Sequence, residues 1–130
     1  MGVWRKRFQG GSAAARKARR AVRRRLDGAL PESRLTDVEL LVSELATNSV
    51  RHGGTGEDGE IAVEADVLDD RVRLRLRDFG EGFEQTRTPR PREDGAGGYG
   101  LVLLDQLADR WGVQRDEGFC VWFEVARGRG

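Results

Sequence analysis

Apolar residues recur at helical spacing through residues 13–30, and arginines fill the opposite face of this stretch. Ser12 is placed to cap the N-terminus of the helix, and Pro31 ends it. The apolar face consists of Ala14, Ala18, Ala21, Val22, Leu26, Ala29 and Leu30. The pattern therefore predicts an amphipathic first helix with a strongly basic outer face.

A second helix is predicted to begin at Thr36, because Glu39 follows three residues later in the pattern of a capping box. It runs to about His52, where a pair of glycines supplies the stop. Its apolar stripe is Val38, Leu41, Val42, Leu45, Ala46 and Val50.

Beyond a glycine-rich loop, apolar and polar residues alternate over 61–67 and again over 72–76. This period of two predicts an antiparallel hairpin. Helical spacing returns at 101–108, and residues 111–115 and 119–125 predict a last hairpin. Because the strands come in consecutive pairs, a mostly antiparallel mixed sheet with helices on one face is more economical than a doubly wound parallel sheet. We therefore expect an α+β fold, a two-layer α/β sandwich.

A chain of 130 residues has the size of one compact domain. Residues 1–130 are therefore interpreted as a single domain with its core at about 12–126. The segment 84–98 is rich in proline, glycine and charge and almost without apolar residues, which is typical of a mobile lid.

The net charge of +1 hides an uneven distribution. Residues 1–30 contain ten Lys or Arg against Asp27 alone, and the remainder is net acidic. A basic run on an amphipathic helix is more often a solvated face or a docking surface for an acidic protein than a nucleic-acid site. Nucleic acid therefore stays the minor interpretation.

Cys120 is the only cysteine of the chain, and its apolar neighbours predict a small buried side chain. No apolar run approaches the roughly 20 residues that span a bilayer, and no signal-peptide pattern is present at the N-terminus. These features predict a soluble cytoplasmic protein without a membrane partner.

Three clusters carry candidate chemistry, and the first lies in the second helix. Glu44, Asn48 and His52 are spaced four apart, so they form one polar line beside the apolar stripe. This polar line is compatible with the solvent-exposed edge of an amphipathic helix. It also fits a hard cation, because Mg²⁺ prefers oxygen ligands completed by phosphates.

The second cluster is the run from Arg77 to Phe83, which includes Asp78, Gly80 and Gly82. Asp78 shares the parity of the apolar residues of its strand, which predicts an inward carboxylate. A buried carboxylate needs a hydrogen-bond partner, and the amino group of a ligand would serve. An Asx turn before the glycines is an equally good interpretation.

The third cluster, Gly95–Leu101, is a glycine-rich loop that leads directly into a helix. Glycines let backbone N–H groups approach phosphate oxygens, and a helix N-terminus adds favourable partial charge. The cluster is neither a Rossmann fingerprint nor a P-loop, and a flexible linker explains it equally well.

Taken in order, E-L-A-T-N-S-V-R-H-G, D-F-G-E-G-F and G-G-Y-G-L resemble the N, G1 and G2 boxes of the GHKL (Bergerat-fold) superfamily of ATPases and kinases. The short chain and the run from Gly98 to Gly112 are similar to the stand-alone anti-sigma-factor serine/threonine kinases of bacteria. The resemblance covers about residues 12–126.

The resemblance implies a role for each matching position. Asn48 would coordinate Mg²⁺ bridging the phosphates of ATP, and Glu44 would be the general base. Asp78 would accept a hydrogen bond from the adenine amino group, with Gly80 and Gly82 beside the base. The remaining implied nucleotide contacts are Arg51, His52, Gly98, Tyr99, Gly100 and Leu101.

The resemblance also implies partners. The protein would transfer the γ-phosphoryl group of ATP to a Ser or Thr of an anti-anti-sigma (STAS-type) partner, would bind a sigma factor and would form a homodimer. Trp4, Phe8 and the basic helix are our own candidates for an interface or partner surface. Phosphoryl transfer needs positioning and charge neutralisation more than a nucleophile. The segment from Glu84 to Asp94 holds no assignable phosphate ligand. A non-catalytic nucleotide-dependent regulatory module and an ATPase without a protein acceptor therefore stay open.

Overall fold

The computed structural model describes residues 3–9, 12–52, 60–78, 99–115 and 119–128, with the backbone alone at residues 12, 48–52, 78, 99–101, 115 and 119. Within these ranges the chain forms three helices and five strands. Their order is β1 (Trp4–Gln9), α1 (Ser12–Leu26), α2 (Glu32–His52), β2 (Glu60–Val67), β3 (Arg71–Asp78), α3 (Tyr99–Leu107), β4 (Arg110–Arg115) and β5 (Phe119–Ala126).

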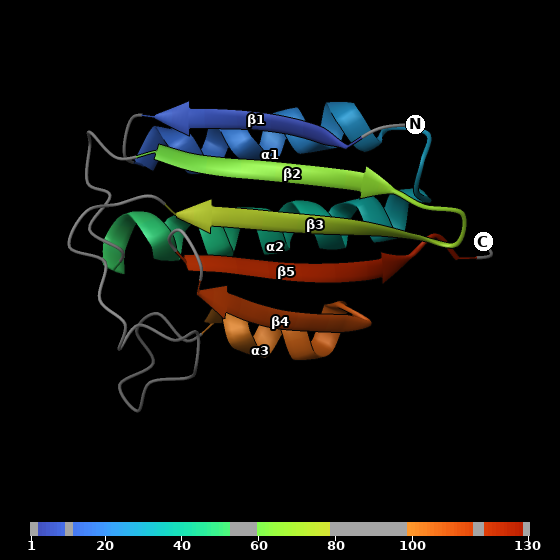
Figure 1. The fold of residues 1–130 in the computed structure, drawn as a ribbon. Helices are drawn as coiled ribbons and strands as arrows, with labels where there is room; N and C mark the ends of the chain where they lie inside the picture. Colours follow the sequence, from blue (N-terminus) through green and yellow to red (C-terminus); the bar gives the residue numbers. More distant parts are fainter. Residues whose placement is uncertain (1–2, 10–11, 53–59, 79–98, 116–118, 129–130) are drawn as a thin grey trace.

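The five strands form one sheet in the order β1-β2-β3-β5-β4, and every neighbouring pair is antiparallel. Helices α1 and α2 lie side by side behind the sheet, and α3 lies beside α2 next to β4 (Figure 1). The predicted α+β two-layer sandwich is confirmed. All strand pairs of the described sheet are antiparallel, so the mixed element of the prediction is not found there.

The core lies between the sheet and the helices. Alternation along β3 buries Val72, Leu74 and Leu76 on the helix side, and Ile61, Val63 and Ala65 of β2 are buried with them. The helical stripes meet this face with Ala14, Ala18, Val22, Leu26, Leu35, Val38, Leu41, Val42, Leu45, Ala46 and Leu104. Cys120 is buried, as predicted.

Strand β1 was not expected from the sequence. Trp4 to Gln9 pair with β2 from Ala65 to Glu60 and form one edge of the sheet. Phe8 is 7% exposed and packs in the core, so only a small part of its ring is accessible to a partner. Trp4 is only partly buried against the same core.

Both helices differ from prediction where α1 passes into α2. Helix α1 ends at Leu26 because Gly28 has a φ of +88°, a left-handed conformation that interrupts a right-handed helix. Helix α2 already begins at Glu32. Thr36 lies inside it, and its hydroxyl donates to the carbonyl of Glu32 at 3.1 Å, so the predicted cap at Thr36 is wrong.

A guanidinium of α1 fixes the first helix on the second. Arg23 forms ion pairs with Glu32 and Glu39 of α2. The hydrogen bonds that Arg23 donates to Glu32, and next those to Glu39, raise the pKa of Arg23 above its ordinary value. The two helices are therefore joined by charge at their solvent edge as well as by apolar packing.

The other face of the sheet is charged. A row crosses all five strands through Arg5, Glu64, Arg75, Trp122 and Gly112. Glu64 is 7% exposed and accepts from the Nε of Arg5 at 2.9 Å. Arg5 on one neighbouring strand and Arg75 on the other therefore flank the buried carboxylate of Glu64 with opposite charge.

Candidate functional site

The second half of α2 carries the first predicted cluster. Its inner face is fixed because Leu41, Leu45 and Ala46 are almost fully buried against the sheet. Glu44 lies between these positions on the helix and is partly exposed. Its side chain therefore borders solvent at the edge of the core, where a ligand can be reached.

Helix α2 continues unbroken to His52, so Glu44, Asn48 and His52 lie four residues apart on one helix, as predicted. Thr47 supports this turn, since its hydroxyl donates to the carbonyl of Ser43 at 2.7 Å. For Asn48, Arg51 and His52 the structure describes the backbone alone. Their ligand contacts stay predictions.

Asp78 is the last residue of β3, a central strand of the sheet. It is paired with Ile61 of β2 on one side and with Phe119 of β5 on the other. The apolar residues of the same parity in β3 are buried. The inward direction of the Asp78 carboxylate stays a prediction, because only its backbone is described.

The third cluster enters at the start of α3. Tyr99, Gly100 and Leu101 form its first turn, as the glycine-rich pattern leading into a helix predicts. Leu104, one turn later, is fully buried and anchors the helix on the core. Gly80, Gly82, Gly98 and the predicted lid at 84–98 lie outside the described residues.

The three clusters meet at one end of the sandwich. The last turn of α2, the C-terminal end of β3 and the N-terminal end of α3 all lie at the left end in Figure 1. Helices α2 and α3 pack against each other there, and α2 also contacts β3. Segments separated by more than twenty residues in the sequence therefore share one edge of the core.

The helix dipoles at this end have opposite signs. Helix α3 presents its N-terminus and α2 its C-terminus, so the α3 side favours an anion and the α2 side favours a cation. Among the side chains that the structure describes, no group of three or more His, Cys, Asp or Glu is placed to hold a metal ion. The predicted metal ligand, Asn48, is not one of those side chains.

Residues 9–125 match the family of histidine kinase-like ATPase domains. The chain belongs to this family. The match runs from the end of β1 into β5 and contains all three clusters. The GHKL resemblance seen in the sequence is thereby confirmed.

Relatives of this histidine kinase-like ATPase domain carry kinase names. The chain is 39% identical over 98 residues to the serine-protein kinase RsbW of Listeria innocua, a match that covers 67% of this chain and 62% of that protein. It is 34% identical over 100 residues to the serine-protein kinase RsbW of Bacillus pumilus, again over 62% of that protein. The chain thus spans less than two thirds of the length of the curated relatives it matches.

Solved structures have the same fold. The RsbU and RsbW domains of a Mycobacterium tuberculosis protein superpose with a TM-score of 0.71 at 21% identity, over 96% of this chain and 32% of that one. A blue-light activated histidine kinase of Erythrobacter litoralis gives a TM-score of 0.58 at 21% identity, over 89% of this chain and 45% of that one.

Part of the sequence run that resembles the kinases has a structural role. Asp109, two residues after the end of α3, accepts from Arg34 of α2 at 3.0 Å and from the N–H of Ala126 at 2.6 Å. Arg34 also donates to the carbonyl of Leu107 at 3.5 Å, close to the C-terminus of α3. These contacts hold the C-terminal end of α3 against the N-terminal part of α2, at the opposite end of the helices from the three clusters.

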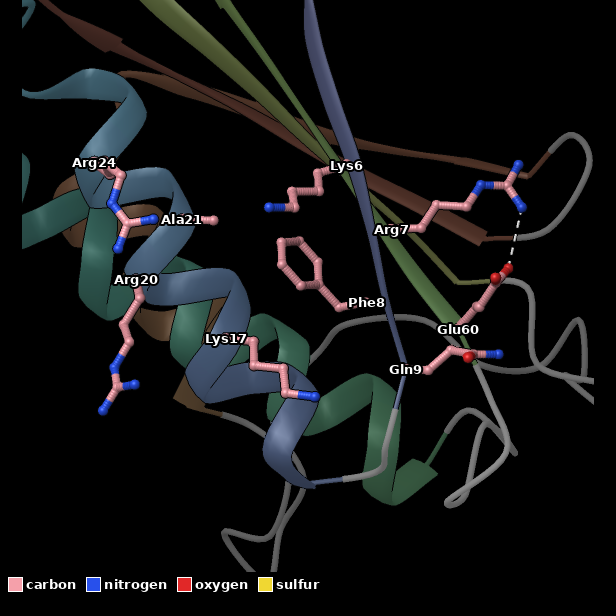
Figure 2. A pocket seen from close by; sticks show the side chains of 9 residues that line it. All are labelled: Lys6, Arg7, Phe8, Gln9, Lys17, Arg20, Ala21, Arg24 and Glu60. Carbon is pink, nitrogen blue, oxygen red and sulfur yellow. Dashed lines mark hydrogen bonds and ion pairs between the residues drawn. The ribbon is translucent and has the colours of Figure 1, made fainter.

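The sequence did not single out a groove between β1 and α1 as a site. It is lined by Lys6, Arg7, Phe8, Gln9, Lys17, Arg20, Ala21, Arg24 and Glu60 (Figure 2). The basic run of the first helix pointed to it, but its other wall is the unpredicted strand β1.

Among the described helices, none is long and apolar enough to cross a membrane.

Proposed function

We propose that the chain binds ATP with Mg²⁺ where α2, β3 and α3 end together, and that it phosphorylates a Ser or Thr of a protein partner. The convergence of the three polar and glycine-rich clusters at one end of the sandwich carries this proposal. Family membership and the kinase names of the relatives support it. The cytoplasmic location expected from the sequence stays a prediction.

The residues at this end suit the parts of a nucleotide. Asp78 would hold the adenine amino group at the end of a central strand. The α3 N-terminus, with Tyr99, Gly100 and Leu101, would face the phosphates through backbone N–H groups and a positive helix dipole. Asn48 would supply an oxygen to Mg²⁺, which neutralises phosphate charge during transfer.

Glu44 is the proposed general base. It is partly exposed on α2, one helical turn before Asn48, so its carboxylate can take the proton of an incoming hydroxyl beside the metal ligand. A base in this place needs access to solvent or to a partner protein. The exposure of Glu44, beside the almost fully buried Leu45, meets that requirement.

The partner that would accept the phosphoryl group is proposed to be an anti-anti-sigma protein of STAS type, and a sigma factor would be the second partner. This part of the proposal rests on the resemblance to the anti-sigma kinases and on the RsbW names. A homodimer is proposed on the same grounds.

Binding of a fluorescent ATP analogue, with and without Mg²⁺, tests the nucleotide site. Asp78→Asn is expected to weaken binding about tenfold or more, because one amide cannot fully replace the acceptor. Asn48→Ala is expected to abolish the effect of Mg²⁺. Asp70→Asn, in the exposed turn between β2 and β3 at the other end of the sheet, is the matched control. Unchanged binding in both site variants would refute the assignment.

Transfer is tested separately with labelled ATP and a candidate STAS-type partner. Glu44→Gln is expected to bind the analogue normally and to lose phosphoryl transfer by about a hundredfold or more. Normal binding by the wild type without transfer to any tested partner would favour the non-catalytic regulatory module. Phosphate release without a partner would instead favour an ATPase.

A further inference from the structure

The groove between β1 and α1 combines an apolar floor with a basic rim. Its floor is made by Phe8, which is 7% exposed, and by Ala21 of α1. Its volume is about 540 Å³. Lys6, Lys17, Arg20 and Arg24 are also part of its lining, and Figure 2 shows Lys6 extending from β1 toward α1 and the other three extending from α1.

The positive charge of the rim is not neutralised within the described part of the chain. Glu60 lines the groove, but it is engaged by Arg7 at 3.1 Å on the far side of β1 (Figure 2). Lys17, Arg20 and Arg24 have no ion-pair partner among the described residues. Lys6 contacts the Phe8 ring, with its Nζ 5.9 Å from the ring centroid. The groove therefore has four cations on its rim, and the one carboxylate in its lining, Glu60, is already paired with Arg7, so an anionic occupant is favoured.

The strand wall adds a second requirement. β1 is an edge strand, so half of its backbone N–H and C=O groups point away from β2 without a strand partner in the described sheet. An extended peptide can satisfy these groups by adding a strand. Its alternate side chains would then point to the helix side of the sheet, as Phe8 does.

The spacing of the cations suits such a peptide. Lys17, Arg20 and Arg24 are three and four residues apart on α1, and at 1.5 Å per residue they span about 10 Å along its axis. Alternate residues of a strand are about 6.6 Å apart, so two or three acidic side chains of one peptide match the row. A single-stranded nucleic acid would need exposed aromatic rings for stacking, and Phe8 is buried.

We infer that the β1–α1 groove docks an extended acidic segment of a partner protein, which adds to the edge of β1 and places alternate Asp or Glu side chains against Lys17, Arg20 and Arg24. The groove is formed by β1 and α1, and the proposed nucleotide site by α2, β3 and α3. The inference is therefore independent of the proposed kinase activity, and it is tested without nucleotide.

The probe is a fluorescent peptide that alternates Thr and Glu, measured by anisotropy at physiological salt with the full chain. Binding is expected to be saturable, and the Thr-Gln analogue is expected not to bind. Arg20→Glu with Arg24→Glu is expected to weaken binding about tenfold or more. The matched control is Arg19→Glu with Arg25→Glu, which reverses two exposed charges of α1 outside the groove. An equal loss in both double variants would mean non-specific attraction and would overturn the inference.

Two further measurements test the strand and the class of occupant. Peptides N-methylated only on Glu or only on Thr carry the same charge, and strand addition predicts that one of them loses binding while the other keeps it. Equal binding of both would overturn strand addition. Oligothymidylate that binds as tightly as the peptide, with the same sensitivity to Arg20→Glu and Arg24→Glu, would assign the groove to nucleic acid instead. Arg20→Gln with Arg24→Gln repeats the test should the charge reversals unfold α1.

Discussion

The indole of Trp122 lies directly over Gly112 on the exposed face of the sheet. The two residues face each other across β5 and β4, and a Cβ at position 112 would meet the Nε1 of Trp122 at 2.7 Å. Two further ring atoms would lie at 2.9 Å. Position 112 therefore requires glycine because the indole ring occupies the space of a Cβ. The backbone conformation there does not itself require glycine.

Gly112→Ala is expected to destabilise the fold by about 1–3 kcal/mol, because the ring or the strand must move. Chemical denaturation followed by tryptophan fluorescence measures the loss. In the background Trp122→Val, the same Gly112→Ala change is expected to cost nothing or to stabilise the strand. A loss of the same size in both backgrounds would show that the ring is not the cause.

Glu124 of β5 is predicted to be the most sensitive charged residue of the sheet. It is 2% exposed, and Arg73 donates to it from Nε at 2.8 Å. Arg71 contributes a further ion pair at 3.4 Å. Glu124→Ala leaves two partly exposed guanidinium groups without their buried acceptor, which is expected to cost about 1–3 kcal/mol in the free energy of unfolding.

The comparison for this prediction is Glu60→Ala, because Glu60 makes a single, more exposed ion pair with Arg7. Its loss is expected to stay below about 1 kcal/mol. Both variants are measured by urea denaturation at neutral pH. Equal losses would contradict the view that burial sets the sensitivity of these carboxylates.

Gly28 is the position where backbone conformation requires glycine. Its φ is +88°, and nothing lies within 4 Å of a Cβ built there. Gly28→Ala is therefore expected to cost about 1–2 kcal/mol through backbone strain alone. Gly28→Asn is expected to cost less, since Asn tolerates the left-handed region. Thermal unfolding of the two variants gives the order, and a more stable Ala variant would contradict this explanation.

The sequence predicted the parts of the fold whose apolar period is long and regular. The alternation of Val72, Leu74 and Leu76 in β3 gave a strand within two residues of its bounds. In β1, by contrast, Trp4 and Phe8 are the only strongly apolar residues among basic ones, so the period is too weak to indicate a strand. The strand forms because β2 offers it a pairing edge, and a single sequence does not show such a partner.

The candidate site was predicted at the level of elements. The helix around Glu44 and the start of α3 at Tyr99 fall where the motifs indicated, because the apolar positions beside them fix the helices. The basic groove was not foreseen as a cavity. Lys17 and Arg20 were recognised as one charged face, but Lys6 joins them only once β1 is placed in the sheet.

The effect of mutating Thr36 depends on where α2 begins. The sequence predicts a start at Thr36, whereas the structure has a start at Glu32. As an N-cap, its hydroxyl would accept from a backbone N–H, and Thr36→Ala would destabilise the protein by about 1 kcal/mol. In the structure its hydroxyl donates to the carbonyl of Glu32 inside the helix, and its side chain is exposed. Ala is the better helix former there, so Thr36→Ala is expected to stabilise the protein by up to about 0.5 kcal/mol.

The sign of this effect decides where α2 begins. Urea denaturation of Thr36→Ala beside Thr36→Ser is sufficient, because Ser keeps a hydroxyl with capping ability and has a lower helix propensity than Ala. A start at Glu32 predicts Ala above Ser in stability, whereas a start at Thr36 predicts Ser above Ala. The second order would mean that the first turn of α2, with Glu32 and its ion pair to Arg23, is not formed in solution.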